Sequence, residues 1–165
     1  MVIDLKRIFA NDNASLPIDY ELDLSSIEFS GYFPLKNPVS AKGCISNRAS
    51  VVLLDLEISY FYEAPCDRCG EVVSNPHTFS VNKVLATSIE GEESDTIITV
   101  PDMSFDIDEF IYSEVVLDAP SKHLCSENCK GVCAVCGKNL NSGECQCDKK
   151  EVDPRLSKLL DLLNN

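Results

Sequence analysis

The chain has 165 residues, of which 27 are acidic and 14 are lysine or arginine, so its net charge at pH 7 is −13. Hydrophobic residues make up 44% and charged residues 25%, which is typical of a soluble globular protein and excludes a largely disordered or fibrous chain. No apolar run approaches the roughly 20 residues of a membrane helix, and the N-terminus lacks the continuous apolar segment of a secretory signal. We therefore expect a cytoplasmic protein that is not bound to a membrane.

The negative charge is concentrated in the first part of the chain. Residues 1–120 carry 21 acidic and 7 basic side chains, whereas residues 121–165 carry 6 acidic and 7 basic ones. A strongly acidic body repels phosphate, so any contact with RNA is expected through the C-terminal part. We predict two parts: a β-rich body at residues 1–120 that ends in a helix, and a cysteine-rich metal-binding tail with a C-terminal helix at residues 121–165.

Segments rich in β-branched and aromatic residues predict the strands of this body. In chain order, strands are expected at residues 2–9, 18–24, 39–45, 50–63, 78–87 and 96–100. The strongest signal is in residues 50–63, where every second residue from Val52 to Tyr62 is apolar or aromatic. Such alternation is typical of an antiparallel strand with one buried face.

The hydrophobic period changes after Asp106. Four apolar residues then recur at helical spacing: Ile107, Phe110, Ile111 and Val115. Asp106 is placed as the N-cap, Glu109 as its capping-box partner, and Pro120 ends this helix. A second helix is expected after Asp153-Pro154, because leucines form another stripe there: Leu156, Leu159, Leu160 and Leu163. The predicted fold class is α+β, a mainly antiparallel β body with two short helices and a cysteine-rich, zinc-knuckle-like C-terminal segment.

Eight of the nine cysteines fall in four closely spaced pairs. The pairs are Cys66 with Cys69, Cys125 with Cys129, Cys133 with Cys136, and Cys145 with Cys147. Disulfides are rare in a reducing cytoplasm, and nine cysteines would leave one thiol over. A C-x2-C-Gly turn, which occurs twice here, directs two sulfurs to one point, and its glycine permits the left-handed continuation. Eight thiolates are enough for two tetrahedral sites, so we predict two zinc ions per chain.

Proximity along the chain suggests how the pairs combine. The last four cysteines of the chain would form one local site: Cys133, Cys136, Cys145 and Cys147. Cys125 and Cys129, whose i, i+4 spacing suits one face of a helical turn, would then join Cys66 and Cys69, with Cys44 outside both sites. A second arrangement, in which the two C-x2-C-Gly turns face each other in a ribbon, stays open.

Recognisable catalytic motifs are missing from the sequence. There is no H-E-x-x-H, no phosphate-binding glycine loop and no nucleophile elbow. The spacing C-x3-C-x2-C that begins at Cys129 matches radical-SAM enzymes, but only 29 residues follow Cys136, too few for the required barrel. Four thiolates leave no open position for water, so we expect structural sites and no enzyme activity. His123 is a candidate spare ligand.

Four groups of residues carry a resemblance to a known family, over residues 50 to 165. They are Cys66-x-Arg68-Cys69, Glu114-x2-Leu117-x2-Pro120, the run Cys125-x3-Cys129-Lys130-Gly131-x-Cys133-x2-Cys136-Gly137-x-Asn139-Leu140-Asn141, and Asp153-Pro154-Arg155 before the leucine stripe. Together they resemble the bacterial YceD family, also called the large ribosomal RNA subunit accumulation proteins. Family members often have proline where this chain has Ala134.

The resemblance implies a non-enzymatic factor for synthesis, processing or stability of large-subunit (23S) ribosomal RNA and for ribosome assembly. The implied partner is a ribosome-assembly or rRNA-processing protein, or pre-rRNA contacted through the tail. The residues alone do not exclude two other functions. One is a redox-sensitive zinc thiol switch, in which oxidation of the cysteines releases metal. The other is a metal-dependent ribonuclease, which would need a site with fewer than four protein ligands.

Overall fold

The computed structural model describes residues 1–29, 31–88 and 94–147. The chain forms two compact units, which are described separately. Unit 1 consists of Met1–Ala64 and Val72–His123, and unit 2 consists of Pro65–Glu71 and Leu124–Asn165. Among the described residues, every helix is too short or too polar to cross a membrane.

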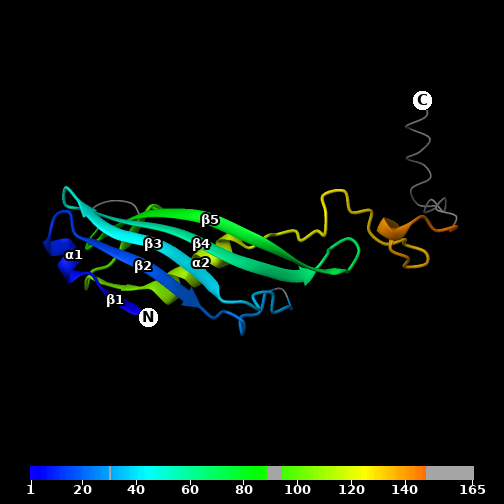
Figure 1. The fold of residues 1–165 in the computed structure, drawn as a ribbon, viewed down its shortest axis with the longest axis horizontal. Helices are drawn as coiled ribbons and strands as arrows, with labels where there is room; N and C mark the ends of the chain where they lie inside the picture. The colour runs from blue at the N-terminus through cyan, green and yellow to red at the C-terminus, as the bar shows by residue number, and fades with distance from the viewer. Residues whose placement is uncertain (30, 89–93, 148–165) are drawn as a thin grey trace, which may run out of the picture. The chain divides into compact units, whose positions relative to one another are not determined.

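Unit 1 is built on a five-stranded sheet with the strand order β2-β3-β4-β5-β6, and on a two-stranded sheet of β1 and β7 (Figure 1). The strands are β1 Val2–Asp4, β2 Ser15–Leu22, β3 Val39–Arg48, β4 Val51–Pro65, β5 Val72–Ala86, β6 Ile97–Thr99 and β7 Ser104–Asp106. The pairs β1–β7, β2–β3 and β3–β4 are antiparallel, whereas β6 joins β5 in parallel. The predicted fold class, α+β with a mainly antiparallel sheet, is confirmed.

The central strand β4 shows how the sequence positions the core. Its even-numbered residues from Val52 to Ala64 are all at most 8% exposed, whereas Val51 and Phe61 on the other face are 44% and 48% exposed. Because side chains of a strand alternate between its two faces, the period of two in the sequence puts one whole face into the core. The predicted inward face of this strand is confirmed.

Helix α2, Ile107–Asp118, lies along one face of the sheet (Figure 1). Its side toward the sheet carries three residues with no exposed surface: Ile107, Ile111 and Val115. The Asp106 side chain accepts hydrogen bonds from the backbone N–H groups of Asp108 and Glu109, so it is the N-cap that the sequence predicts. The predicted helix after Asp106 is therefore confirmed.

The predicted strand at residues 2–9 is wrong in its second half. Strand β1 ends at Asp4, and helix α1, Lys6–Ala10, follows. Leu5 and Ile8 are 0% and 6% exposed, three residues apart, so they bury one side of a helical turn. The alternation of apolar and charged residues fits either structure in so short a segment. The other predicted helix, at residues 153–163, lies outside the described residues.

Candidate metal centres

Unit 2 brings eight cysteine sulfurs together in two groups of four. Within each group, all Sγ atoms lie within 4.8 Å of one another. We call Cys66, Cys69, Cys125 and Cys129 the first group, and Cys133, Cys136, Cys145 and Cys147 the second group. This is the combination of pairs that proximity in sequence favours, and it differs from the ribbon with facing C-x2-C-Gly turns. Cys44 lies on β3 in unit 1, outside both groups.

The two C-x2-C-Gly turns have the same backbone hydrogen bonds. The N–H of Gly70 donates to the carbonyl of Cys66 at 2.8 Å, and the N–H of Cys66 donates to the carbonyl of Glu71 at 2.8 Å. In the second turn, Gly137 donates to Cys133 at 2.8 Å, and Cys133 donates to Lys138 at 2.9 Å. Both glycines have positive φ, 75° and 71°, as the sequence predicts.

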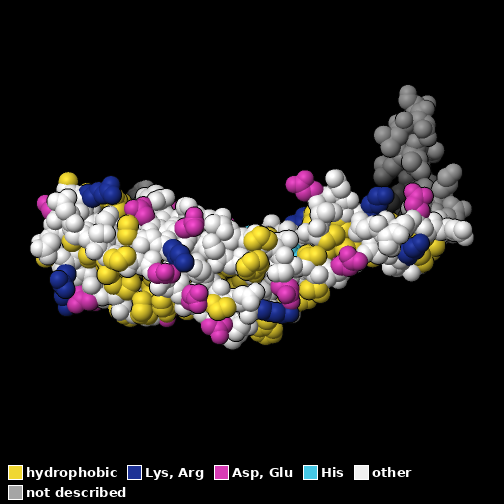
Figure 2. All heavy atoms as spheres, viewed as in Figure 1, with side chains coloured by type: hydrophobic (Ala, Val, Ile, Leu, Met, Phe, Trp, Pro, Cys, Tyr) yellow, Lys and Arg dark blue, Asp and Glu magenta, His cyan; other side chains and the backbone are white. Residues whose placement is uncertain are grey.

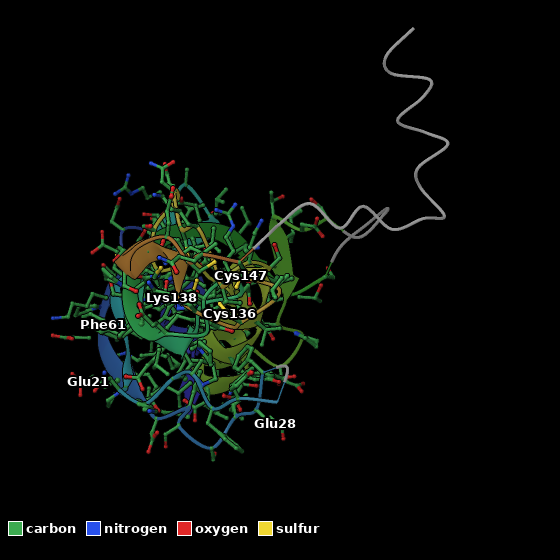
Figure 3. The ribbon with its side chains drawn as sticks, turned by 90° about the vertical axis from the view of Figure 1, so that its right-hand side faces the viewer. Glu21, Glu28, Phe61, Cys136, Lys138 and Cys147 are labelled. Atoms are coloured by element: carbon green, nitrogen blue, oxygen red, sulfur yellow. The ribbon has the colours of Figure 1, made fainter. Side chains whose placement is uncertain are left out.

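The remaining cysteine pairs complete the groups from irregular segments. Residues 121–130 form turns and bends, and the N–H of Cys129 donates to the carbonyl of Ser126 at 3.1 Å. The helical turn expected for Cys125 and Cys129 is therefore wrong, although both sulfurs still reach the first group. In the second group, Cys136 and Cys147 lie beside each other (Figure 3).

Arg68, inside the first turn, holds the segment that carries Cys129. Its Nη1 atom donates to the carbonyl of Cys129 at 2.8 Å and to that of Glu127 at 3.1 Å. Its own carbonyl accepts a hydrogen bond from the N–H of Val132 at 3.2 Å. Arg68 therefore links the first turn to the segment 127–132, through one guanidinium nitrogen and its own backbone carbonyl.

The loop of the second group also contacts the first. Asn141 belongs to the short 3-10 helix η1, Leu140–Ser142, and its Nδ2 atom donates to Sγ of Cys129 at 3.2 Å. Its Oδ1 atom accepts from the N–H of Lys130 at 2.8 Å. Asn139 donates to the carboxylate of Glu71 at 2.8 Å. In the sequence these asparagines stand out only as part of the run that resembles the family, because spacing alone does not show what a side-chain amide binds.

Backbone donors favour the thiolate form of the first cysteine in each turn. Burial opposes ionisation of Cys66 and is the largest single influence, but N–H groups of Cys125, Arg68 and Cys69 together lower its pKa to about 6. N–H groups of Cys136 and Val135 lower the pKa of Cys133 to about 6. These two sulfurs are thus prepared to be ligands, since a metal binds the thiolate.

Neighbouring thiols raise the pKa of other cysteines in the two groups. The hydrogen bond with the Cys129 thiol, followed by burial, raises the pKa of Cys125 to about 12. The hydrogen bond with Cys136, followed by burial, raises the pKa of Cys147 to about 12. Four negative sulfurs this close repel one another, so complete ionisation of a group needs a cation among them.

The spacing of the sulfurs fits a single tetrahedral ion. With metal–sulfur bonds of about 2.3 Å, neighbouring ligands of a zinc ion lie about 3.8 Å apart. Two sulfur pairs of the first group, Cys66 with Cys129 and Cys69 with Cys125, are 3.8 Å and 3.7 Å apart. Disulfide-bonded sulfurs would be about 2.05 Å apart, and all nine cysteines are free thiols in the structure. The sulfur distances in the first group thus fit a tetrahedral metal ion, and both groups could hold one.

The interior of unit 2 consists largely of these sulfurs. In its described part, residues 65–71 and 124–147, the buried residues are Cys66, Cys129, Gly131 and Cys133. A unit this small without a hydrocarbon core normally requires a metal or disulfides to fold. His123 is different: it is buried in unit 1, where its ring lies 5.2 Å from that of Tyr62 and its Nε2 is 3.2 Å from the carbonyl oxygen of Val73. It belongs to neither cysteine group.

Comparison with known proteins adds independent evidence. The family model described as large ribosomal RNA subunit accumulation protein YceD matches residues 54–163. The uncharacterized protein YlbN of Bacillus subtilis is 30% identical over 129 residues, which cover 77% of this chain and 75% of YlbN. No solved structure matches the chain significantly.

Two further relatives match over shorter stretches. The uncharacterized protein Rv2926c of Mycobacterium tuberculosis is 29% identical over 102 residues, 59% of this chain and 49% of that protein. The chloroplastic large ribosomal RNA subunit accumulation protein YCED homolog 1 of maize is 42% identical over 52 residues, 31% of this chain and 16% of the maize protein. The chain thus spans half or less of these two relatives, but the family model covers most of the chain, including all eight grouped cysteines. The chain belongs to the YceD family.

Proposed function

We propose that this protein is a non-enzymatic factor that promotes the accumulation of large-subunit ribosomal RNA during ribosome assembly. Membership of the YceD family, whose description names this process, is the observation that carries the proposal. The acidic body and the absence of catalytic motifs in the sequence are compatible with an assembly factor. We place its action in the cytoplasm, where a reducing environment keeps cysteines available as thiolates.

In this proposal, each cysteine group holds one zinc ion, and the two ions are structural. The first ion would be bound by Cys66, Cys69, Cys125 and Cys129, and the second by Cys133, Cys136, Cys145 and Cys147. Bound zinc would supply the energy that folds unit 2, since its interior offers sulfur atoms and little hydrocarbon. Four thiolate ligands close the coordination shell, which argues against the metal-dependent ribonuclease.

The partner is expected to be a protein of ribosome assembly or rRNA processing, or pre-rRNA contacted through the tail. The acidic surface of the body favours a protein over RNA for unit 1, because phosphate is repelled there.

Depletion of the protein in its own cells tests the role in RNA accumulation. We expect the ratio of large-subunit to small-subunit ribosomal RNA to fall, and to recover on complementation with the natural chain. Complementation with Cys133→Ser should fail, whereas Cys44→Ser, outside both groups, should succeed. An unchanged RNA ratio on depletion would contradict the proposed function.

Elemental analysis of protein purified without chelator tests the metal sites. We expect about two zinc ions per chain, following the four-ligand rule for structural zinc. Cys69→Ser should lose one ion, Cys145→Ser should lose the other, and Cys44→Ser should keep both. A count near zero or one in the natural chain would contradict the two-site arrangement.

A thiol switch is the second candidate, and one observation favours it. Cys133 has a pKa lowered to about 6, and its neighbour Cys136 is exposed, which is the environment of a reactive thiol pair. Titration of metal release with a mild oxidant separates the two candidates. Release of one zinc ion per group at low oxidant, reversed by a thiol reductant, would support the switch. Tightly held metal with inert thiols would support purely structural sites.

A further inference from the structure

Unit 1 leaves an apolar face of α2 open to solvent. The side of α2 opposite to the sheet carries Tyr112, Val116 and Leu117, which are 39%, 42% and 79% exposed. The side toward the sheet is filled by Ile107, Ile111 and Val115. Tyr112 and Val116 are neighbours at i and i+4 on this side, and exposed apolar side chains that gather on a surface mark an interaction site.

A groove adjoins this exposed side. It has a volume of about 470 Å³ and lies between α2 and the strands β1, β6 and β7. Part of its lining is apolar: Val2, Ile98, Val100, Phe105 and Phe110. Glu109 and Ser113 line it as well, and on a helix they are neighbours of Tyr112 and Val116. We call Tyr112, Val116, Leu117 and this groove the α2 face.

The surroundings of the α2 face are negative. Helix α2 contains four acidic residues and no lysine or arginine: Asp108, Glu109, Glu114 and Asp118. The lysine that lines the groove, Lys83, has its Nζ atom 3.2 Å from the carboxylate of Glu114 and is thereby neutralised. Asp106 adds a further carboxylate to the lining. The ammonium group of Met1 pairs with Asp106 and Asp108, and Glu114 pairs with Lys83, so the exposed Glu109 is the carboxylate of the lining for which no ion pair is found in the described residues. A partner of the α2 face would therefore meet apolar contacts bordered by Glu109 and by the net negative charge of the unit.

The charge of the whole unit restricts what can bind there. Unit 1 contains 19 acidic and 7 basic side chains, a net charge of −12. Acidic side chains are spread along the face of the body that Figure 2 shows, interleaved with hydrophobic ones. This field repels the RNA backbone, and it also repels a second copy of the same unit. It attracts a polycation and accelerates its association.

We propose that the α2 face binds a positively charged amphipathic segment of a protein partner. Apolar side chains of the partner would cover Leu117 and Val116 and enter the groove, and its lysine or arginine side chains would lie against the acidic border. This is the mode in which an amphipathic helix binds a hydrophobic groove through anchors at helical spacing. The inference goes beyond the proposed role in RNA accumulation and does not depend on the cysteine groups.

Titration of the full chain with a synthetic amphipathic helix, leucines on one face and lysines on the other, tests the proposal. We expect saturable binding by isothermal calorimetry that weakens as salt is added. The double variant Val116→Ser/Leu117→Ser should bind at least about tenfold more weakly, as expected when interface anchors are lost. The matched control is Phe61→Ser, because Phe61 is 48% exposed on β4 and points away from the core. It should bind like the natural chain.

A second variant keeps the test valid if the serine variant folds poorly. Glu109 is exposed, so Glu109→Lys should preserve the fold and still weaken binding of the lysine peptide. It should strengthen binding of the same peptide with glutamates in place of the lysines. Both variants should retain the zinc content of the natural chain, which separates a failure here from a failure of the metal proposal.

Three results would overturn the proposal. The first is equal binding by the natural chain and by both α2-face variants. The second is binding of single-stranded RNA that the Leu117 variant abolishes, which would make the occupant a nucleic acid. The third is self-association in sedimentation that the same variant abolishes, which would make the occupant a second copy.

Discussion

The Nδ2 atom of Asn141 lies 3.2 Å from Sγ of Cys129, so the loop between the ligands of the second cysteine group donates a hydrogen bond to the first group. Second-shell donors of this kind orient ligands and tune their charge, and removing one typically weakens metal binding about 10- to 100-fold. The two proposed sites are therefore expected to influence each other.

Asn141→Asp tests this connection, because it replaces a donor by a negatively charged acceptor of the same shape. We expect the first site to bind metal about tenfold more weakly, at the lower end of the second-shell range because Asn141 is exposed. The second site should be nearly unchanged. Cobalt titration in chains with one site disabled by Cys69→Ser or Cys145→Ser measures each site separately. Ser142→Ala is the control, and equal loss at both sites would refute the assignment.

Arg68→Ala should destabilise unit 2, because it removes the donors to the carbonyl oxygens of Glu127 and Cys129. A loss of about 1 kcal/mol is expected, the usual net value of a partly exposed hydrogen bond. Hydrogen exchange at the amide of Val132, which donates to the Arg68 carbonyl, reports the local effect. Lys42→Ala, which removes an exposed ion pair with Asp19, should leave this exchange unchanged. Arg68→Lys should restore the natural rate only in part.

Removal of metal should affect the two units differently. The core of unit 1 is formed by apolar and aromatic side chains and contains none of the cysteines, whereas three of the buried residues of unit 2 are cysteines. A strong chelator should therefore abolish protection from hydrogen exchange in residues 65–71 and 124–147, and leave protection in β3 and β4 largely intact. Equal loss of protection in both units would show that the sulfur groups support the whole chain.

Thiol titration should show whether unit 2 stays folded without metal. In the folded unit the pKa values of Cys66 and Cys133 are lowered from 9.0 to about 6, so each contributes stability that is present above its ordinary pKa and is lost as the pH falls through about 6. Because we expect unit 2 to unfold without metal, the thiolate absorbance of the metal-free protein should show one transition near the ordinary pKa of cysteine. A step near pH 6 that Cys66→Ser and Cys133→Ser each reduce by half, and that Cys44→Ser leaves unchanged, would show instead that unit 2 stays folded without metal.

Tyr60→Phe tests the attachment of the end of α2 to the sheet. Tyr60 is 2% exposed, and its hydroxyl donates to Asp118 at 2.7 Å. Burial, followed by this hydrogen bond, raises the pKa of Tyr60, so the hydroxyl remains a donor at neutral pH. Loss of a hydrogen bond to a charged group should lower the free energy of unfolding by about 1.5–3 kcal/mol in urea denaturation. Tyr32→Phe, at a residue that is 51% exposed, should have almost no effect.

Much of the fold could be predicted because its main signals are periodic. Strand β4 alternates over its whole length, and α2 has both a helical stripe and a side-chain cap, so local preference and burial agree there. Strand β5 begins at Val72, six residues before the predicted start, because Pro76 breaks the pattern of a central strand. Helix α1 was missed because five residues are too few to show a period.

The cysteines of the candidate site could be predicted, but their surroundings could not. Their spacing is typical of metal binding, and proximity in sequence favoured the grouping that the structure has, although the ribbon arrangement stayed open until the fold was known. Arg68 and Asn141 were missed as contacts of Cys129 because their partners lie 61 and 12 residues away. A contact of this kind leaves no periodic trace, and only the folded chain brings the two residues together.

The distance along the chain between Cys66 and Cys129 also sets an order of events during synthesis. These residues are 63 positions apart, so the first cysteine group cannot assemble until a long intervening segment has left the ribosome. Strands β2 to β4 have all their residues available much earlier, and domains generally fold as units from the N-terminal side. The thiols of Cys66 and Cys69 must therefore stay reduced, without Cys125 and Cys129, while unit 1 folds. Closure of the first group would then be one of the last steps in maturation of this chain.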